Sequence, residues 1–141
     1  MNYLWLIQAS SNSTYTTSSY NKESFLRFIV EGQYNISLEL YEGKEFIYGE
    51  KPIIYYDSYK IIIKDDYGKI HEIEGENRTN KITLKLNTNE SSVLHNLLMT
   101  NKKLIIDIVQ INTYDNTRCC FTVDCTGYGK VFKRLKDSTE L

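Results

Sequence analysis

The sequence predicts a mostly β fold, an antiparallel β-sandwich or meander of about eight to ten strands with two short helices near the C-terminus. Apolar and polar residues alternate along many short segments, as they do in a strand with one buried face. Turn-forming residues separate these segments, and helical spacing is confined to the last third of the chain. The 141 residues predict a single domain over 1–141, in which 136–141 form a frayed tail.

The first strands lie in the N-terminal third. Residues 2–8 predict a short apolar strand, and the Ser/Thr-rich residues 10–19 predict a loop or a polar edge strand. Segments 26–30 and 36–40 each carry their apolar side chains at alternate positions. Because side chains alternate between the two faces of a strand, both segments are predicted to bury one face.

The loop between these two segments sets which residues face each other. A two-residue loop beginning at Gly32 would place apolar residues of one strand opposite polar residues of the other. A three-residue loop over 31–33 places Phe28 opposite Ile36 and gives Gly32 a positive φ. The sequence therefore favours the three-residue loop.

Further strands are predicted before the first helix, at 45–48, 53–56, 59–65, 70–74 and 81–87. Residues 65–68 form a turn, with Gly68 suited to the left-handed conformation. Residues 61–63 are all isoleucine, which is typical of a central strand covered on both faces.

A helix is predicted over 90–100, with Asn89 as its N-cap and Glu90 in its first turn. It is expected to plug an open end or edge of the sheet with a stripe at helical spacing, formed by Val93, Leu94, Leu97 and Leu98. The chain then continues with a strand at 104–111, a loop at 112–117, a returning strand at 118–125 and a second helix at 128–136.

Composition narrows the classes of partner. The formal net charge is −1 and Lys/Arg runs are no longer than two, so we expect no nucleic acid and no acidic membrane as a partner. No segment approaches the length of about 18 apolar residues that a membrane-spanning helix needs. The residues after Met1 lack the pattern of a secretory leader.

Three cysteines, Cys119, Cys120 and Cys125, fall on one predicted strand. The strand holds Cys125 too far from the other two for a disulfide, and a bridge between adjacent residues would strain the backbone. Their spacing on a strand also cannot close a zinc site, so no disulfide, metal or cofactor is expected. Free thiols favour the cytoplasm, whereas a leader removed ahead of this sequence would place the chain in the periplasm or outside the cell.

Asp107 lies in the middle of an apolar strand, where a buried, unpaired carboxylate costs free energy. Three interpretations follow, given from the most to the least expected. Asp107 marks a solvent face, or it pairs with Arg118 on the neighbouring strand, or it is a functional acid. No nucleophile or metalloprotease motif accompanies it, and the two histidines, His71 and His95, lie on a strand and a helix.

Two further patterns supply candidate binding residues. Residues 127–130, which include Tyr128 and Lys130, are similar to a phosphate-binding loop that opens a helix, although a tight turn with close packing explains them better. A second pattern is an aromatic and basic face of the type that stacks single-stranded nucleic acid, formed by Tyr55, Tyr56, Tyr59 and Tyr67 with Lys60 and Lys64. The neighbouring acidic residues Asp57, Asp65 and Asp66 oppose this function.

The C-terminal half resembles a β-sandwich module of bacterial envelope proteins, the invasion-associated locus B type and the accessory proteins of type VI secretion clusters. The similar parts are a Leu-rich helix at 91–98, a strand at 104–111, a motif at 123–127, Tyr128, Phe132 and Leu135 in the last helix, and a central hairpin at 59–73. The resemblance covers about half of the chain and implies no catalytic residues. The cysteine pair that the family often carries is absent here.

These observations predict a non-enzymatic binding or accessory protein that acts through protein–protein contact. The resemblance implies an association with a bacterial envelope or secretion system, and an exposed edge strand would allow strand addition by a partner or a homo-oligomer. The alternative is a small intracellular inhibitor or immunity protein encoded by a phage or a genomic island. An enzyme with an unrecognised site around Asp107, Arg118 and His71 ranks last.

Overall fold

The computed structural model describes residues 8–9, 24–42, 45–46, 57–77, 83–110 and 118–139. Within these residues the fold is mostly antiparallel β with two helices near the C-terminus, which confirms the predicted class. The strands are β1 (Gln8–Ala9), β2 (Ser24–Gly32), β3 (Asn35–Glu42), β4 (Glu45–Phe46), β5 (Asp57–Lys64), β6 (Ile70–Asn77), β7 (Thr83–Lys85), β8 (Lys103–Gln110) and β9 (Arg118–Asp124). The helices are α1 (Thr88–Thr100) and α2 (Tyr128–Thr139), which continues beyond the predicted end at 136.

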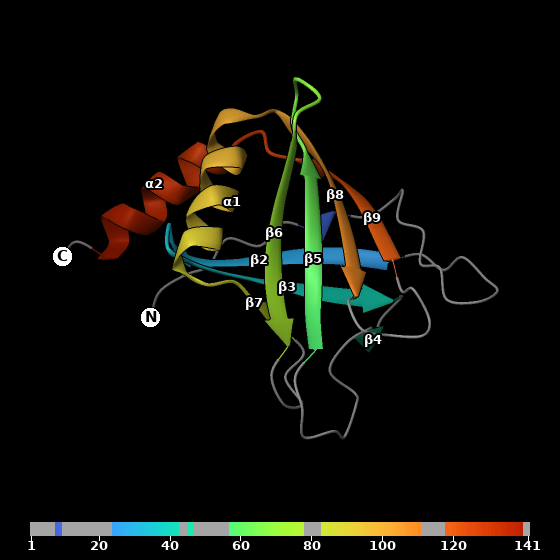
Figure 1. The fold of residues 1–141 in the computed structure, drawn as a ribbon. Helices are drawn as coiled ribbons and strands as arrows, with labels where there is room; N and C mark the ends of the chain where they lie inside the picture. Colours follow the sequence, from blue (N-terminus) through green and yellow to red (C-terminus); the bar gives the residue numbers. More distant parts are fainter. Residues whose placement is uncertain are drawn as a thin grey trace.

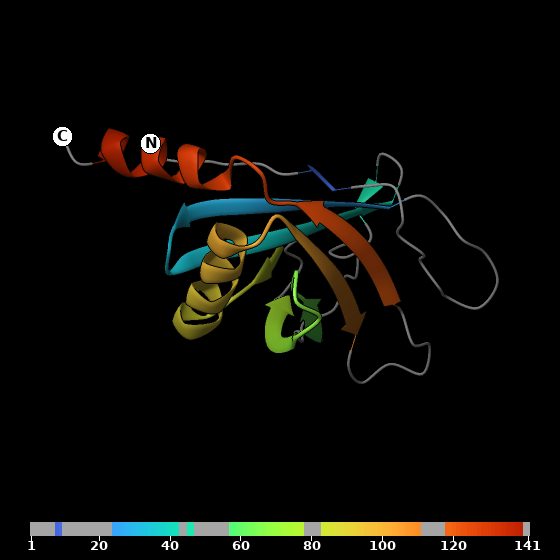
Figure 2. The ribbon, with the colours of Figure 1, turned by 90° about the horizontal axis from the view of Figure 1, so that it is seen from above.

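The described strands form one curled sheet in the order β1-β2-β3-β7-β6-β5-β8-β9, with β4 beside β3. The long strands β2 and β3 cross behind β5 and β6 (Figure 1). The sheet curls until β9 lies close to β1 and β2, as the view from above shows (Figure 2). The predicted strand at 53–56 and the loop at 10–19 lie outside the described residues.

The β2–β3 hairpin corrects the predicted register. Val30 pairs with Ile36 and Phe28 with Leu38, whereas the three-residue loop had placed Phe28 opposite Ile36. The turn consists of two residues, Gln33 and Tyr34, and a bulge between Val30 and Gly32 restores the match of the buried faces. Gly32 lacks the predicted positive φ, because the bulge rather than a left-handed glycine adjusts the register.

The core lies on the inner face of the curled sheet, and alternate residues of the strands fill it. The buried strand residues include Leu26, Phe28, Val30, Ile36, Leu38, Tyr59, Ile61, Ile63, Leu104, Ile106, Ile108, Phe121 and Val123. The apolar faces of segments 26–30 and 36–40 are buried as predicted for the described side chains, but Glu39, on the predicted polar face, is buried as well and pairs with Arg27 at 3.5 Å. Ile62, in contrast, is only partly buried, so the strand at 61–63 is not covered equally on both faces.

Helix α1 occupies the place where the sheet opens. Within the described residues, strands β6 and β7 pair at Glu76 and Lys85 alone, and α1 begins three positions after the end of β7. Its first turn is bonded to both sides of the opening. The Ser91 hydroxyl accepts a hydrogen bond of 3.1 Å from the Ile36 N–H, and the Glu90 carboxylate accepts one from the Glu74 N–H.

The ends and the buried face of α1 differ in part from the prediction. The N-cap is Asn87 rather than Asn89, because the Asn87 side chain reaches the Glu90 N–H at 2.8 Å. Of the predicted stripe, the three leucines are buried but Val93 remains 37% exposed. Neither described helix is long and apolar enough to cross a membrane.

Candidate functional site

The predicted binding residues do not converge on one site. Tyr59 and Tyr128 are buried in the core, so neither ring is available at the surface. Tyr56 lies outside the described residues, and Lys130 is exposed on α2. The tyrosine-based surface for single-stranded nucleic acid therefore loses Tyr59, whose ring packs in the core.

Asp107 and Arg118 come from the neighbouring strands β8 and β9, and Asp107 lies on the outer face of the sheet. Asp107 is partly buried there, opposite Ile62 on one side and Cys120 on the other. Arg118 pairs with Val109, which places it two positions along the same face. The side chain of Arg118 lies outside the described residues, so the predicted ion pair between the two stays a prediction.

A buried polar cluster joins α1 to α2. His95 Nδ1 lies 2.9 Å from the Tyr128 hydroxyl, and the His95 ring centroid lies 4.4 Å from that of Phe132. Burial lowers the pKa of His95, and burial raises the pKa of the Tyr128 hydroxyl. Both groups are therefore neutral near pH 7, which suits a packed interior.

Cys125 lies next to this cluster and is also buried. Burial, assisted by the charges of Asp124 and Asp66, raises the pKa of its thiol to about 12. Because the thiolate is the reactive form of cysteine, a thiol with this pKa is inert. This cluster holds two helices together and provides no nucleophile.

The segment between β9 and α2 is a tight turn. Gly127 has a φ of +89°, which favours glycine, and the Tyr128 N–H donates to the Cys125 carbonyl at 3.1 Å. The Asp124 carboxylate accepts the Thr126 N–H at 2.9 Å. A hydrogen bond from the Thr126 side chain, with help from this N–H, lowers the pKa of Asp124. These contacts favour the tight-turn interpretation over a phosphate-binding loop.

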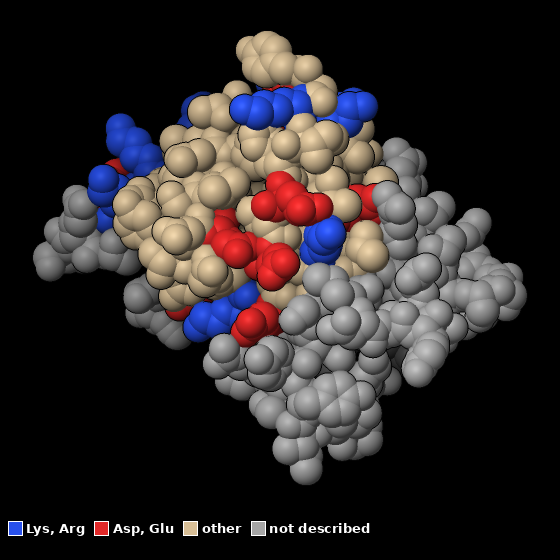
Figure 3. Space-filling model, in the orientation of Figure 1, with Lys and Arg blue, Asp and Glu red and all other residues tan. Residues whose placement is uncertain are grey.

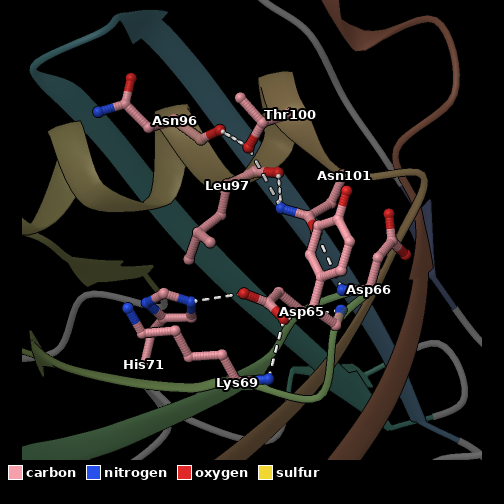
Figure 4. A network of polar contacts seen from close by, with 9 residues as sticks. Asp65, Asp66, Lys69, His71, Asn96, Leu97, Thr100 and Asn101 are labelled. Atoms are coloured by element: carbon pink, nitrogen blue, oxygen red, sulfur yellow. Dashed lines mark hydrogen bonds and ion pairs between the residues drawn. The ribbon is translucent and has the colours of Figure 1, made fainter.

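The turn between β5 and β6 is built around Asp65 (Figure 4). One oxygen of its carboxylate accepts the N–H groups of Tyr67 and Lys69, both at 2.9 Å, and the other lies 2.9 Å from His71 Nε2. The hydrogen bond with His71, with help from the two N–H groups, lowers the pKa of Asp65. Gly68 has the predicted left-handed conformation, with a φ of +82°.

Asp66 fastens this turn to the joint between α1 and β8. Its N–H donates to the Asn101 side chain at 2.9 Å, and its carboxylate accepts the N–H groups of Lys102 at 2.6 Å and Lys103 at 3.1 Å. The Asn101 side chain in turn donates to the Leu97 carbonyl at 3.0 Å. The turn is thus bonded to residues 101–103, which lie far from it in the sequence.

The side chains on this turn point outward. Tyr67 is 92% exposed and Ile70 is 56% exposed, both high values for apolar side chains of this size. We call this surface the β5–β6 tip, which consists of Tyr67 and Ile70 with the exposed lysines Lys64, Lys69, Lys102 and Lys103. Figure 3 shows basic side chains at the end of the molecule where Figure 1 places this turn, and acidic side chains over the strands below it.

The β5–β6 tip is the candidate functional site. The sequence predicted the turn at 65–68 and grouped Tyr67 with Lys64 in a possible binding face, but it did not add Lys102 and Lys103, because these lysines come from a separate segment. An aromatic residue at the centre of a predicted turn was the available signal. Among the described residues, no three His, Cys, Asp or Glu side chains gather in a way that would hold a metal ion.

Comparisons with known proteins add no relative. No protein-family model matches the chain, and neither curated proteins nor solved structures gave a match. The resemblance to bacterial envelope proteins therefore stays a prediction from the residues at 59–73 and 91–135.

Proposed function

We propose that this chain is a non-enzymatic binding protein that acts through protein–protein contact at the β5–β6 tip. The observation that carries the proposal is Tyr67, an almost fully exposed aromatic side chain on a turn whose backbone is fixed by Asp65 and Asp66. Tyrosine is among the residues that contribute most to binding when a partner buries them.

The rigidity of the turn strengthens this proposal. Binding orders flexible loops at a cost in conformational entropy, and a turn that is already ordered avoids much of that cost. The carboxylates of Asp65 and Asp66 accept backbone N–H groups on the inner side of the turn. They therefore hold the tip in place, which is a supporting role rather than a catalytic one.

Strand addition at β6 is a second way to make the same kind of contact. Beyond its pairing at Glu76, β6 has no ladder partner over 70–75 on the side away from β5 within the described residues. The Glu90 carboxylate already occupies the Glu74 N–H, so α1 covers part of this edge. We therefore favour the tip as the principal contact.

The shape of the tip also favours the second candidate function, a small inhibitor or immunity protein. The β5–β6 turn extends from the end of the sheet (Figure 1), and Tyr67 on it is 92% exposed. Such a projecting aromatic side chain suits insertion into a concave site on an enzyme. An accessory role at a bacterial envelope or secretion system rests on the resemblance alone. The identity of the captured partner would separate these two roles.

The test is quantitative capture of partners from a lysate of the source cell, with tagged wild-type chain and a Tyr67→Ala variant. We expect one partner at stoichiometric yield with the wild type and a loss of at least tenfold with Tyr67→Ala. Tyr34→Ala is the matched control, since Tyr34 is 55% exposed on the β2–β3 turn. Equal capture by all three chains would contradict the proposal.

A further inference from the structure

We propose that the partner surface that receives the β5–β6 tip is acidic and belongs to a protein. This inference rests on the proposed function and specifies the chemistry of its partner. Four exposed lysines, Lys64, Lys69, Lys102 and Lys103, surround the exposed Tyr67. An aromatic ring encircled by ammonium groups fits an apolar pocket with a carboxylate rim.

The local acids do not cancel this charge from the partner's side. Asp65 and Asp66 are the aspartates of the turn, and the carboxylate of each accepts two backbone N–H groups from the turn or from the start of β8. These contacts hold both carboxylates against backbone N–H groups; the Asp65 side chain is 9% exposed, whereas Asp66 is an exposed residue like the four lysines. Exposed Asp124 lies opposite Lys103, so the tip has four lysines against three aspartates and keeps a positive formal charge.

The flank of the tip argues against a polyanion. Glu72 and Glu74 are exposed on β6, and Lys60 is held by an ion pair of 3.5 Å with Glu72. Figure 3 shows acidic side chains over this face, directly below the basic end. A nucleic acid strand or an anionic membrane would extend past the tip and meet these carboxylates, whereas a compact acidic pocket would not.

A second copy of this chain is also a poor occupant of the tip. Two tips would bring eight lysines together, and like charges across an interface oppose association. The acidic flank of β6 would attract a tip, but each copy also brings its own four lysines to such a contact. A different protein with an acidic concave surface avoids this repulsion.

The experiment places a photo-crosslinking phenylalanine analogue at position 67 of the full chain and irradiates it in source-cell lysate. Mass spectrometry then identifies the crosslinked peptide. We expect a protein peptide rich in Asp and Glu, with a yield that falls at least tenfold between low salt and about 0.5 M salt because salt screens exposed charges. The same fall is expected at low salt for the charge-reversal variant Lys102→Glu/Lys103→Glu.

The lysine variant leaves the turn intact, since Asp66 bonds the backbone N–H groups of Lys102 and Lys103 rather than their side chains. Lys133→Glu/Arg134→Glu on α2 is the matched control, because it changes the net charge equally at two exposed residues away from the tip. The control should crosslink as the wild type does.

The outcomes separate the two proposals. A protein crosslink that is insensitive to salt and to Lys102→Glu/Lys103→Glu, or that lies in a basic peptide, overturns the acidic partner and leaves the binding function standing. Crosslinks to nucleic acid or lipid overturn the inference of an acidic protein partner and identify the partner as a nucleic acid or a membrane. No crosslink to any protein, with the chain folded and labelled, overturns the proposed function itself.

Discussion

Two polar clusters join α1 to other parts of the molecule, and each contains one of the two histidines. In the buried cluster, His95 meets the Tyr128 hydroxyl between α1 and α2, with Phe132 packed on its ring. In the turn network, His71 meets Asp65 in a partly buried pair, and Asn101 and Asp66 complete the connection through exposed contacts. The first cluster is surrounded by apolar side chains and the second by exposed lysines.

The difference shows that the surroundings of a polar residue decide whether it mainly stabilises the fold or mainly positions a surface side chain. Polar groups in the interior must be paired, because an unsatisfied buried group costs free energy, so the His95 cluster serves stability. Polar groups at the surface can exchange partners with water, so the exposed contacts of Asp66 in the turn network contribute less stability. The Asp65 network instead fixes the backbone position of Tyr67.

The largest expected effect comes from a change in α1, which both clusters share. Leu97 is buried and lies above the Asp65–His71 pair (Figure 4). Leu97→Asp should lower the free energy of unfolding by about 4 kcal/mol, because it buries a carboxylate among apolar side chains. Urea denaturation measures this, with Asn96→Asp, an exposed neighbour, as the control. An unchanged melting temperature would refute the placement of α1.

A matched pair of tyrosine truncations tests the comparison directly. Tyr128→Ala should cost about 3–5 kcal/mol, because it leaves a cavity in the core and removes the partner of His95. Tyr67→Ala should change stability by less than about 0.5 kcal/mol, since its ring contacts water. Denaturation midpoints give both values. Similar costs for the two variants would mean that the tip is part of the packed structure.

A smaller effect is expected when the turn network is opened at Asp66. Asp66→Ala removes the acceptor for two backbone N–H groups at an exposed site, which should cost about 1 kcal/mol. Hydrogen exchange should show faster exchange at the N–H groups of Lys102 and Lys103, with little change in the core. A global loss of protection would contradict the local role of this network.

The two clusters should also respond to different ranges of pH. Burial lowers the pKa of His95 from 6.5, so its stabilising contribution is complete above pH 6.5 and is lost as the pH falls toward its folded value. The pKa of Asp65 is lowered from 3.8, so its contribution is complete above that pH and is lost below it.

Denaturation midpoints measured across pH should therefore decline in two stages, one beginning below pH 6.5 and one below pH 3.8. His95→Gln keeps a polar side chain beside Tyr128 but cannot titrate, so it should remove the first stage and retain the second. A first stage that persists in His95→Gln would show that another group causes it.

Much of the fold could be predicted from local patterns. The alternation of apolar and polar residues predicted strands β2, β3, β5 and β6. Helical spacing predicted α1, and three of its four predicted buried residues are buried. Val93 was the exception, because a stripe at helical spacing shows which residues share a face but not how wide a surface the sheet covers. The N-cap is Asn87 rather than the predicted Asn89. Both residues suit a cap, so the local sequence does not choose between them.

The candidate site could be predicted less well. The turn at 65–68 and its left-handed Gly68 follow from residue type, and Asp at the start of a turn is expected to bind its backbone. The contacts of Asp66 with Lys102 and Lys103 join residues 36 and 37 positions apart, which no local pattern contains. The candidates Tyr59 and Tyr128 failed as surface residues because an amphipathic ring suits a core and a surface equally.

The sequence by itself determined the type of each described element and the face that most of them bury, because both depend on the spacing of neighbouring residues. The tertiary structure decided the β2–β3 register, where a bulge after Val30 shifted the pairing without changing the buried face. It also decided which polar residues meet, as with His95 and Tyr128, 33 positions apart. The physical reason is that pairing and burial depend on which distant segments pack together, and only the folded chain brings those segments into contact.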